Sequence, residues 1–262
     1  MIDSAKPWLK VPISHKAYFK LPDGYKSLWD EIRLQMYYEV ETQGRHRAIR
    51  SFQNCGRVGE DMYWIPVTRV QPVLSKYFRL QIVDRRVEIP VEIPAPKFTL
   101  RPDQDEIAQE YLSGNDDCAI INGKPGFGKT ILALYLAYKL KQKTLIITTN
   151  LNIRSQWERE IRRHFGFTAG VIGSGKFITD PPIVVANIQT LVKHSEKLRR
   201  VFGLVIVDEM HHCVASTFSS FLEFSAARYK IGLSGTLKRR DGLNVMFKDF
   251  FGYKVFKPAV NN

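Results

Sequence analysis

The feature that most constrains how this chain can fold is the glycine-rich stretch GKPGFGKT at residues 123–130. The apolar run CAII precedes it and the amphipathic stretch ILALYLAYKL follows it, so it joins a strand to a helix. Glycines let the backbone N–H groups point at phosphate oxygens, Lys129 adds a positive charge, and Thr130 offers a hydroxyl to Mg²⁺. A glycine turn that matches by chance is the weaker reading. The predicted nucleotide-binding loop comprises Gly123, Lys124, Pro125, Gly126, Phe127, Gly128, Lys129 and Thr130.

The pattern around this loop predicts an α/β fold. Short apolar runs near 118–121, 144–148, 183–186, 204–207 and 231–233 alternate with helical patterns at 103–112, 131–140, 153–165 and 217–227. Such alternation is typical of a parallel sheet with helices on both faces, a P-loop sheet in this case. Ligands of these sheets bind beyond the carboxyl ends of the strands, where the glycine loop lies.

A second motif, LVIVDEMHH at residues 204–212, is an apolar strand that runs directly into two carboxylates. Asp208 can hold Mg²⁺ through its water shell, and Glu209 can orient or deprotonate the water that attacks a γ-phosphate. His211 is the candidate sensor of that phosphate. Together with the loop, the motif predicts a site that binds ATP and Mg²⁺ and hydrolyses ATP, with Lys129, Asp208, Glu209 and His211 as catalytic residues and Thr130 and Asp208 as metal ligands.

The histidines and cysteines also suggest a zinc site, but the pattern argues against it. Consecutive residues that leave a strand do not all converge on one point, and a second pair of ligands is absent near the Asp-Glu-His-His cluster. The three cysteines, Cys55, Cys118 and Cys213, are odd in number and far apart. We expect reduced thiols and neither a disulfide framework nor a metal site.

The net charge of +13 favours a polyanionic partner, and nucleic acid is the first candidate. An ordinary basic surface remains the alternative, because the charge is spread along the chain. No segment approaches the roughly 18 consecutive apolar residues of a membrane span, and the first residues show no signal-peptide core. We therefore expect no membrane partner and a cytoplasmic location, which is the host cytoplasm if the protein is viral.

The chain is expected to divide near residue 96 into a small α+β domain (1–96) and the ATPase lobe (97–262). The stretch VEIPVEIPAPKF at 87–98 carries three prolines and favours an extended connector. Ahead of it, residues 28–41 suggest one helix, and residues 61–70 and 77–89 suggest strands. Aromatic and basic residues of this domain fit either nucleic-acid contacts or core and surface positions: Trp29, Tyr37, Tyr38, Arg45, Arg47 and Arg50.

With these motifs the chain resembles the superfamily 2 helicases and translocases of the DExH type. Their box corresponds to Asp208-Glu209-Met210-His211, and the resemblance covers residues 98 to about 257, the first of the family's two RecA-like lobes. It implies that the stretch LRPDQ at residues 100–104 recognises adenine, with Gln104 contacting the edge of the base and Arg101 assisting. It also implies that Ser234, Gly235 and Thr236 couple hydrolysis to movement, with a glycine where the family has alanine.

The resemblance further implies that Thr149, Asn150, Gln189 and Thr190 contact the nucleic-acid backbone, because hydroxyls and amides near helix N-termini suit phosphates. Gln156 and Trp157 are expected to pack. The stretch GLSGTLKRRDG, followed by FGYKVFKP, is most similar to the UvsW-type and XPB-like DNA helicases. It differs from DEAD-box proteins, whose motif ends in Asp. The implied partner is duplex or branched DNA in recombination or repair, with RNA a weaker candidate.

A second RecA-like lobe completes the ATP site in that family, and we expect it beyond Asn262, so that this chain acts as an N-terminal half. Its ATPase activity is then expected to be nearly absent, since the second lobe supplies the arginine fingers. Two alternatives remain open. One is a single-lobe module that binds ATP and nucleic acid without motor activity, and the other is a motor lobe of a restriction-type complex.

Overall fold

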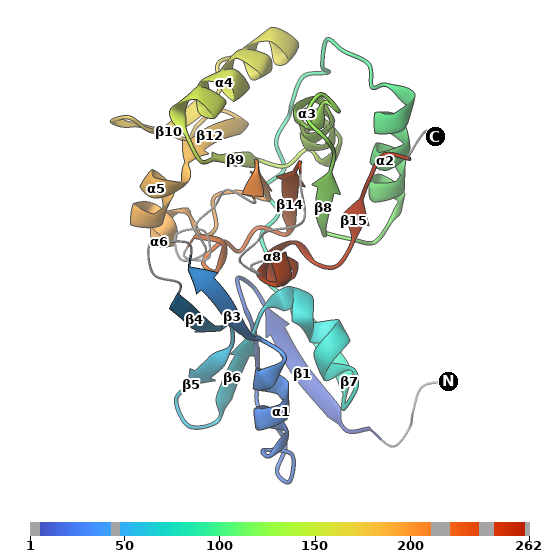
Figure 1. Cartoon of the computed structure of the whole chain (residues 1–262), viewed down its shortest axis with the longest axis vertical. Coiled ribbons are helices and arrows are strands. Elements are labelled where there is room, and N and C mark those ends of the chain that lie inside the picture. The colour runs from blue at the N-terminus through green and yellow to red at the C-terminus, as the bar shows by residue number, and fades with distance from the viewer. Residues whose placement is uncertain (1–5, 43–47, 211–220, 236–243, 260–262) are drawn as a thin grey trace. The chain divides into compact units, whose positions relative to one another are not determined.

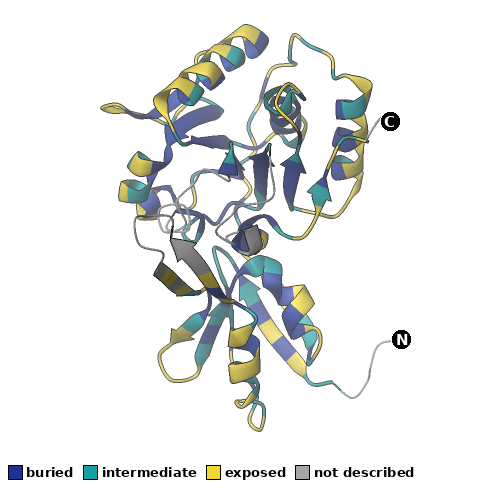
Figure 2. Cartoon of the chain, in the orientation of Figure 1, coloured by how far each residue is buried: buried dark blue, intermediate teal, exposed yellow. Residues whose placement is uncertain are grey.

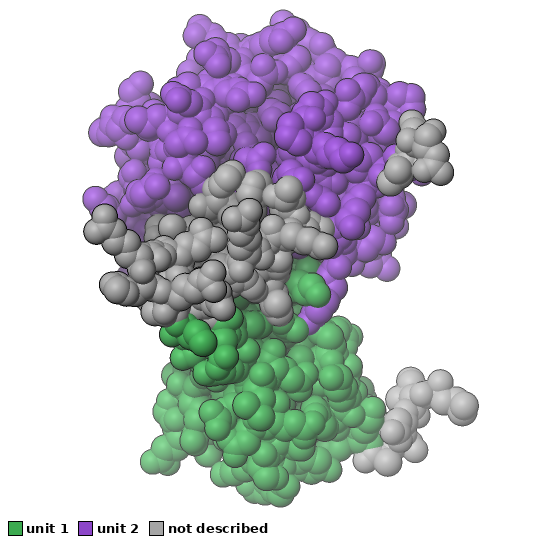
Figure 3. All heavy atoms as spheres, in the orientation of Figure 1, with its two compact units in different colours: residues 1–86, 238–252 green, residues 87–237, 253–262 purple. Residues whose placement is uncertain are grey.

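The computed structural model describes residues 6–42, 48–210, 221–235 and 244–259 (Figure 1). The chain forms two compact units, which Figure 3 colours separately. Unit 1 comprises residues 1–86 and 238–252, and unit 2 comprises residues 87–237 and 253–262. In the part of the chain that the structure describes, no helix is both long and apolar enough to cross a membrane.

Unit 2 contains an eight-stranded sheet with the order β11-β10-β12-β9-β13-β14-β8-β15. All neighbouring strands pair in parallel except β10 and β11. Its strands are β8 (Cys118–Asn122), β9 (Thr144–Thr148), β10 (Gly170–Gly173), β11 (Lys176–Ile178), β12 (Ile183–Asn187), β13 (Leu204–Val207), β14 (Tyr229–Ser234) and β15 (Val255–Phe256).

Helices flank this sheet: α2 (Pro102–Ser113), α3 (Lys129–Leu140), α4 (Leu151–Phe165), α5 (Ile188–Leu191) and α6 (Ser195–Leu198), with the 3₁₀ turn η3 (Val192–His194) between the last two. Every residue of β9, β12 and β13 is buried, as expected of strands covered on both faces (Figure 2). One core packs α2, α3 and α4 against the sheet through residues such as Ile107, Leu136 and Trp157.

The predicted α/β fold is therefore confirmed. The five predicted strands correspond to β8, β9, β12, β13 and β14, and the first three predicted helices to α2, α3 and α4. Three short strands were not predicted from the sequence: β11 and β15, which form the two edges of the sheet, and β10, which lies next to β11. The fourth predicted helix, 217–227, lies partly outside the described residues; within them, Phe221 and Leu222 are helical and Ala227 instead forms a bridge with Val87.

Unit 1 contains a five-stranded sheet with the order β5-β6-β2-β1-β7 and a separate β3–β4 pair. Its elements are β1 (Trp8–Ile13), β2 (Ala17–Phe19), α1 (Leu28–Leu34), β3 (Tyr37–Thr42), β4 (Ala48–Gln53), β5 (Gly56–Val58), β6 (Met62–Ile65), η1 (Val67–Arg69), the π-helix η2 (Val70–Leu74) and β7 (Arg79–Asp84). A second core, with Val11, Phe19, Ile32 and Leu74, joins α1 and η2 to the sheet.

The single helix predicted over 28–41 is wrong. The helix ends at Leu34, and residues 37–42 form β3, which pairs antiparallel with β4. Alternating aromatic, acidic and β-branched residues in YYEVET favour a strand there. Two aromatic candidates for nucleic-acid contact have core positions: Tyr38 is buried, and the Trp29 ring packs on Tyr63 with their centroids 4.5 Å apart.

The expected connector at 87–98 is extended, but the division between the units falls after Arg86 and not near residue 96. The reason is a set of hydrogen bonds that attach its first residues to unit 2. Val87 N–H donates to Ala226 O (2.7 Å), Lys143 N–H to Ile89 O (2.7 Å) and Val91 N–H to Lys141 O (3.0 Å).

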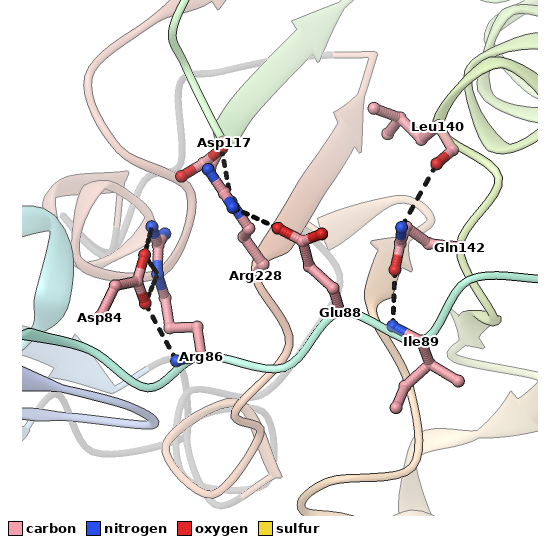
Figure 4. Close-up of polar contacts among 8 residues, drawn as sticks. All are labelled: Asp84, Arg86, Glu88, Ile89, Asp117, Leu140, Gln142 and Arg228. Atoms are coloured by element: carbon pink, nitrogen blue, oxygen red, sulfur yellow. Dashed lines mark hydrogen bonds and ion pairs between the residues drawn. The ribbon is translucent and has the colours of Figure 1, made fainter.

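Side chains add to this attachment, as Figure 4 shows. Arg228 pairs with Glu88 of the connector and with Asp117 (3.3 Å), and the Gln142 side chain accepts from Ile89 N–H (2.7 Å). These partners precede β14, β8 and β9, so the connector crosses the amino ends of the strands. That edge is opposite to the one where the sequence places the nucleotide.

Helix α8 (Asn244–Phe251) belongs to unit 1 although it lies late in the chain. Its Asp249 is buried and accepts hydrogen bonds from Tyr38 Oη (2.7 Å), Asn54 Nδ2 (2.7 Å) and Arg69 Nε (2.5 Å). Burial raises the pKa of the Asp249 carboxyl, while Arg69 and the two neutral donors act in the opposite direction. The chain then returns to unit 2 as β15, which pairs with β8.

We predict that Asp249→Asn destabilises unit 1 strongly, because it leaves the Arg69 guanidinium buried without its counter-charge. Breaking such a buried pair costs about 3–5 kcal/mol. Urea unfolding followed by tryptophan fluorescence measures this, since three of the four tryptophans lie in unit 1. As control, Asp30→Asn breaks an exposed pair with Arg33 and should cost less than about 1 kcal/mol. Equal losses in the two variants would contradict the role of Asp249.

Candidate functional site

The glycine loop follows β8 and its last two residues, Lys129 and Thr130, begin α3, as the sequence predicts for a phosphate-binding loop. Gly128 is the N-cap of α3 and has φ +85°, a left-handed conformation that side chains rarely adopt. A Cβ at Gly128 would also lie 2.4 Å from Gln104 Nε2. The left-handed backbone therefore favours glycine here, and the Gln104 amide would have to shift to admit a side chain.

Lys129 is oriented by two neighbours. Its Nζ donates to Gly123 O at 2.8 Å and lies 3.7 Å from Glu209 Oε1. Glu209 has φ +47°, which is uncommon for a residue with a side chain and costs roughly 1 kcal/mol or more. Strained backbone of this kind is concentrated at functional sites.

Asp208 follows the last residue of β13, and its backbone N–H donates to Ile147 O at 3.0 Å. Its carboxylate Oδ2 accepts a hydrogen bond of 2.8 Å from Trp157 Nε1, on α4. Burial raises the pKa of the Asp208 carboxyl, whereas the Trp157 hydrogen bond and the Lys129 charge lower it. The structure therefore gives Trp157, predicted only to pack, a polar contact with a predicted metal ligand.

These residues line one pocket of about 450 Å³. From the loop and α3 it includes Pro125, Gly126, Gly128, Lys129, Thr130 and Ile131; from α4, Ile153, Gln156 and Glu160; and after β13, Asp208 and Glu209. In the described ranges, no group of three or more His, Cys, Asp or Glu residues could enclose a metal ion.

Gln104 and Arg101 are near the loop but are not among the residues that line this pocket. Gln104 is buried; its Oε1 accepts from Arg101 N–H (3.0 Å) and its Nε2 donates to Phe127 O (2.8 Å). Arg101 Nη2 also donates to Phe127 O. The contacts shown hold the loop in place, and the predicted recognition of adenine stays a prediction.

The predicted coupling motif contacts the loop directly. Ser234 is fully buried at the end of β14, and its carbonyl accepts from Gly123 N–H at 3.0 Å. A Cβ at Gly235 would lie 3.9 Å from both Glu209 Oε2 and Lys129 Nζ. Alanine would therefore fit at this position in ordinary van der Waals contact. Thr236 and His211 lie outside the described residues, as does Cys213.

The four residues expected to contact nucleic acid lie together in a second, more open pocket of about 580 Å³. Thr149 and Asn150 follow β9, while Gln189 and Thr190 follow β12 in the neighbouring strand position. The remaining lining residues are Leu151, Asn152, Ser174 and Asn187. We call these eight residues the polar groove. Asn150 also caps α4, since its Oδ1 accepts from Ile153 N–H at 2.9 Å.

Sequence reasoning missed Asn187 and Ser174, which a buried arginine organises. Arg154 Nη1 donates to Asn187 Oδ1 (2.8 Å) and Ser174 Oγ (3.3 Å), and its Nε pairs with Glu158 (3.0 Å). Two sequence features could have indicated these residues: Asn187 ends an apolar strand, and Ser174 lies between two glycines. Gln156 and Glu160, which line the pocket beside the glycine loop, were not predicted there because their helical spacing is typical of packing residues.

The loop, the carboxylates and the parallel sheet define a P-loop lobe of the RecA-like class. Residues 97–239 match the family described as "Type III restriction enzyme, res subunit". The chain belongs to this family, and the resemblance to superfamily 2 helicases is confirmed.

Named relatives agree with this assignment. The chain is 58% identical over 97% of its length to "Probable helicase D10" of Escherichia phage T5, and 29% identical over 71% of its length to "DNA 3'-5' translocase XPB2" of Sulfurisphaera tokodaii. It spans only about half of these relatives, 55% and 43% respectively.

Solved structures share the fold. The UvsW helicase of bacteriophage T4 is similar with a TM-score of 0.69 at 20% identity, over 95% of this chain and 99% of that chain. A Sulfolobus solfataricus SWI2/SNF2 ATPase core solved with double-stranded DNA has a TM-score of 0.50 at 19% identity, over 62% of this chain and 38% of that chain.

We predict that Gly128→Ala destabilises unit 2 more than Gly126→Ala does. Both glycines have φ +85°, but only at Gly128 does a Cβ meet another atom within 4 Å. The left-handed conformation costs each variant about 1–2 kcal/mol, and the collision with Gln104 adds about 1–3 kcal/mol in Gly128→Ala. Thermal unfolding monitored by circular dichroism compares the two. Equal midpoints would show that the Gln104 contact does not constrain the loop.

Proposed function

We propose that this chain is the ATP-binding half of a helicase or translocase that acts on duplex or branched DNA in recombination or repair. Membership of the helicase family is shown above, whereas DNA as substrate, hydrolysis of ATP and the biological role are proposals. The observation that carries the proposed binding and hydrolysis of ATP is the pocket in which Lys129, Thr130, Asp208 and Glu209 meet at the carboxyl edge of the sheet.

In this proposal the loop N–H groups and Lys129 bind the phosphates, while Thr130 and Asp208 hold Mg²⁺, which stabilises negative charge on the phosphates. Glu209 orients the attacking water and accepts its proton. In the structure Lys129 and Glu209 are 3.7 Å apart, so the cation and the base face the same space. His211, the last residue of the DExH box, lies outside the described residues, so its role as sensor of the γ-phosphate stays a prediction.

The polar groove supports nucleic acid as the second ligand. Its lining is made of hydroxyl and amide side chains, apart from Leu151, and none carries a negative charge. Groups of this kind contact phosphate and sugar oxygens without reading bases. The net charge of +13 adds an attraction that does not depend on sequence. The resemblance to UvsW-type and XPB-like helicases supports DNA over RNA as the proposed nucleic acid.

Since the chain spans about half the length of its relatives, we propose that the remaining half supplies a second lobe with the arginine that completes hydrolysis. Such an arginine contributes about 10³–10⁵ in rate. Robust DNA-stimulated turnover by these 262 residues alone would instead favour a self-sufficient lobe. The cytoplasmic location and the possible DNA-binding role of unit 1 stay predictions.

We predict that Lys129→Ala weakens Mg²⁺–ATP binding at least about tenfold, because it removes a charged contact with the phosphates. The matched control is Lys139→Ala, which removes an exposed lysine from the last turn of the same helix. Calorimetric titration with Mg²⁺–ATP measures both variants, and circular dichroism checks their fold. Equal affinities would refute the nucleotide site.

We also predict that Asn152→Ala combined with Gln189→Ala weakens DNA binding about thirtyfold, at about 1 kcal/mol for each of the two neutral hydrogen bonds removed. The slope of log affinity against log salt should stay unchanged, because no positive charge is removed. Fluorescence anisotropy with a labelled duplex measures both quantities. Gln109→Ala, an exposed position on α2, serves as control. A double variant that binds like the control would exclude the polar groove as the DNA site.

A further inference from the structure

Helix α4 forms one wall of the nucleotide pocket. Ile153, Gln156 and Glu160 line the pocket from this helix, at spacings of three and four residues that place them on one face. Trp157 lies between them in sequence and is 1% exposed. Its ring is part of the core that joins α4 to the sheet.

The indole N–H of Trp157 is the only polar group on that side chain, and it can only donate. It donates to Asp208 Oδ2 at 2.8 Å. Because the ring is enclosed by core residues, the direction of this donor is fixed by packing. The hydrogen bond therefore limits rotation of the Asp208 carboxylate.

We propose that Trp157 is a positioning residue that holds the Asp208 carboxylate in the orientation needed to bind Mg²⁺ with ATP. This inference rests on the proposed function of the pocket. Partners that orient a metal-binding carboxylate typically change metal affinity about 10–100-fold when they are removed. The Trp157 contact is well placed for this role because α4 also lines the pocket itself.

Trp157 has a second connection through α4. The same helix begins in the polar groove, where Asn150 caps it and Asn152 lines the groove. Arg154, one turn before Trp157, is bonded to Asn187 of the groove. One helix therefore joins the groove to the Asp208 carboxylate within unit 2.

Trp157→Phe tests the proposal, because it removes the N–H and keeps an aromatic ring in the core. ATP binding to the 262-residue chain is measured by calorimetry at a series of Mg²⁺ concentrations and with Mg²⁺ chelated. We expect the Mg²⁺ concentration for half-maximal enhancement of ATP binding to rise about 10–100-fold. Binding of Mg²⁺-free ATP should be unchanged, since the loop and Lys129 are intact.

Tyr111→Phe is the matched control. It removes a hydroxyl from a buried ring of the same core, where Tyr111 Oη donates to Asp117 O at 3.4 Å, and it touches neither pocket. This variant should keep the wild-type dependence on Mg²⁺. Circular dichroism and thermal unfolding of both variants report the loss of core stability separately.

The outcomes distinguish the claims. An unchanged Mg²⁺ dependence in Trp157→Phe would overturn the positioning role. A parallel loss of Mg²⁺-free and Mg²⁺-bound ATP affinity would also overturn it, because it would assign Trp157 to packing alone. If the wild-type chain binds no ATP, the proposed function fails, and this inference fails with it.

Discussion

Hydrogen bonds between parallel strands hold the pocket beside the glycine loop and the polar groove in place. The ladders join β12 to β9, β9 to β13, β13 to β14 and β14 to β8, with Asn187 opposite Thr148 and Ser234 opposite Asn122. Two of the functional segments extend these ladders past the strands, through Gly123 N–H to Ser234 O and Asp208 N–H to Ile147 O. The register of the sheet therefore sets the distances among the loop, the carboxylates and the polar groove.

The opposite edge of the sheet, at the amino ends of the strands, binds the connector. There the connector is bonded to residues that precede β8, β9 and β14, through Asp117, Gln142 and Arg228 (Figure 4). The segment that follows the predicted coupling motif contributes α8 to unit 1 before the chain returns to the sheet as β15. Unit 1 is thus assembled from two separate stretches of chain, and Asp249 supplies the buried charge that its Arg69 requires.

Local patterns were sufficient to predict the features that depend on local chemistry. The glycine loop, Asp208, Glu209 and the strands before them follow from spacing and apolar runs, and the groove residues Thr149, Asn150, Gln189 and Thr190 from the family resemblance. Contacts between distant residues could not be predicted in this way. The sequence indicates only packing for Trp157, because its contact with Asp208 forms when β13 places the two side by side. Likewise, nothing near Asp249 in sequence indicates its partners Arg69, Asn54 and Tyr38. The helix predicted over 28–41 was wrong in its second half, because the apolar residues there fit the helical period and the strand period equally. Pairing with β4 decides for the strand.

The central claim is that the backbone of residues 123–130 binds the phosphates of ATP while Asp208 lies beside them. Hydrogen–deuterium exchange read by mass spectrometry tests this claim directly, because exchange reports on the N–H groups themselves. Addition of Mg²⁺–ATP should slow exchange in peptides that contain Gly126, Gly128 and Lys129, and should leave β1 and β2 of unit 1 unchanged. Saturating ATP that leaves exchange of the loop unaltered, or protects only residues outside it, would contradict the account.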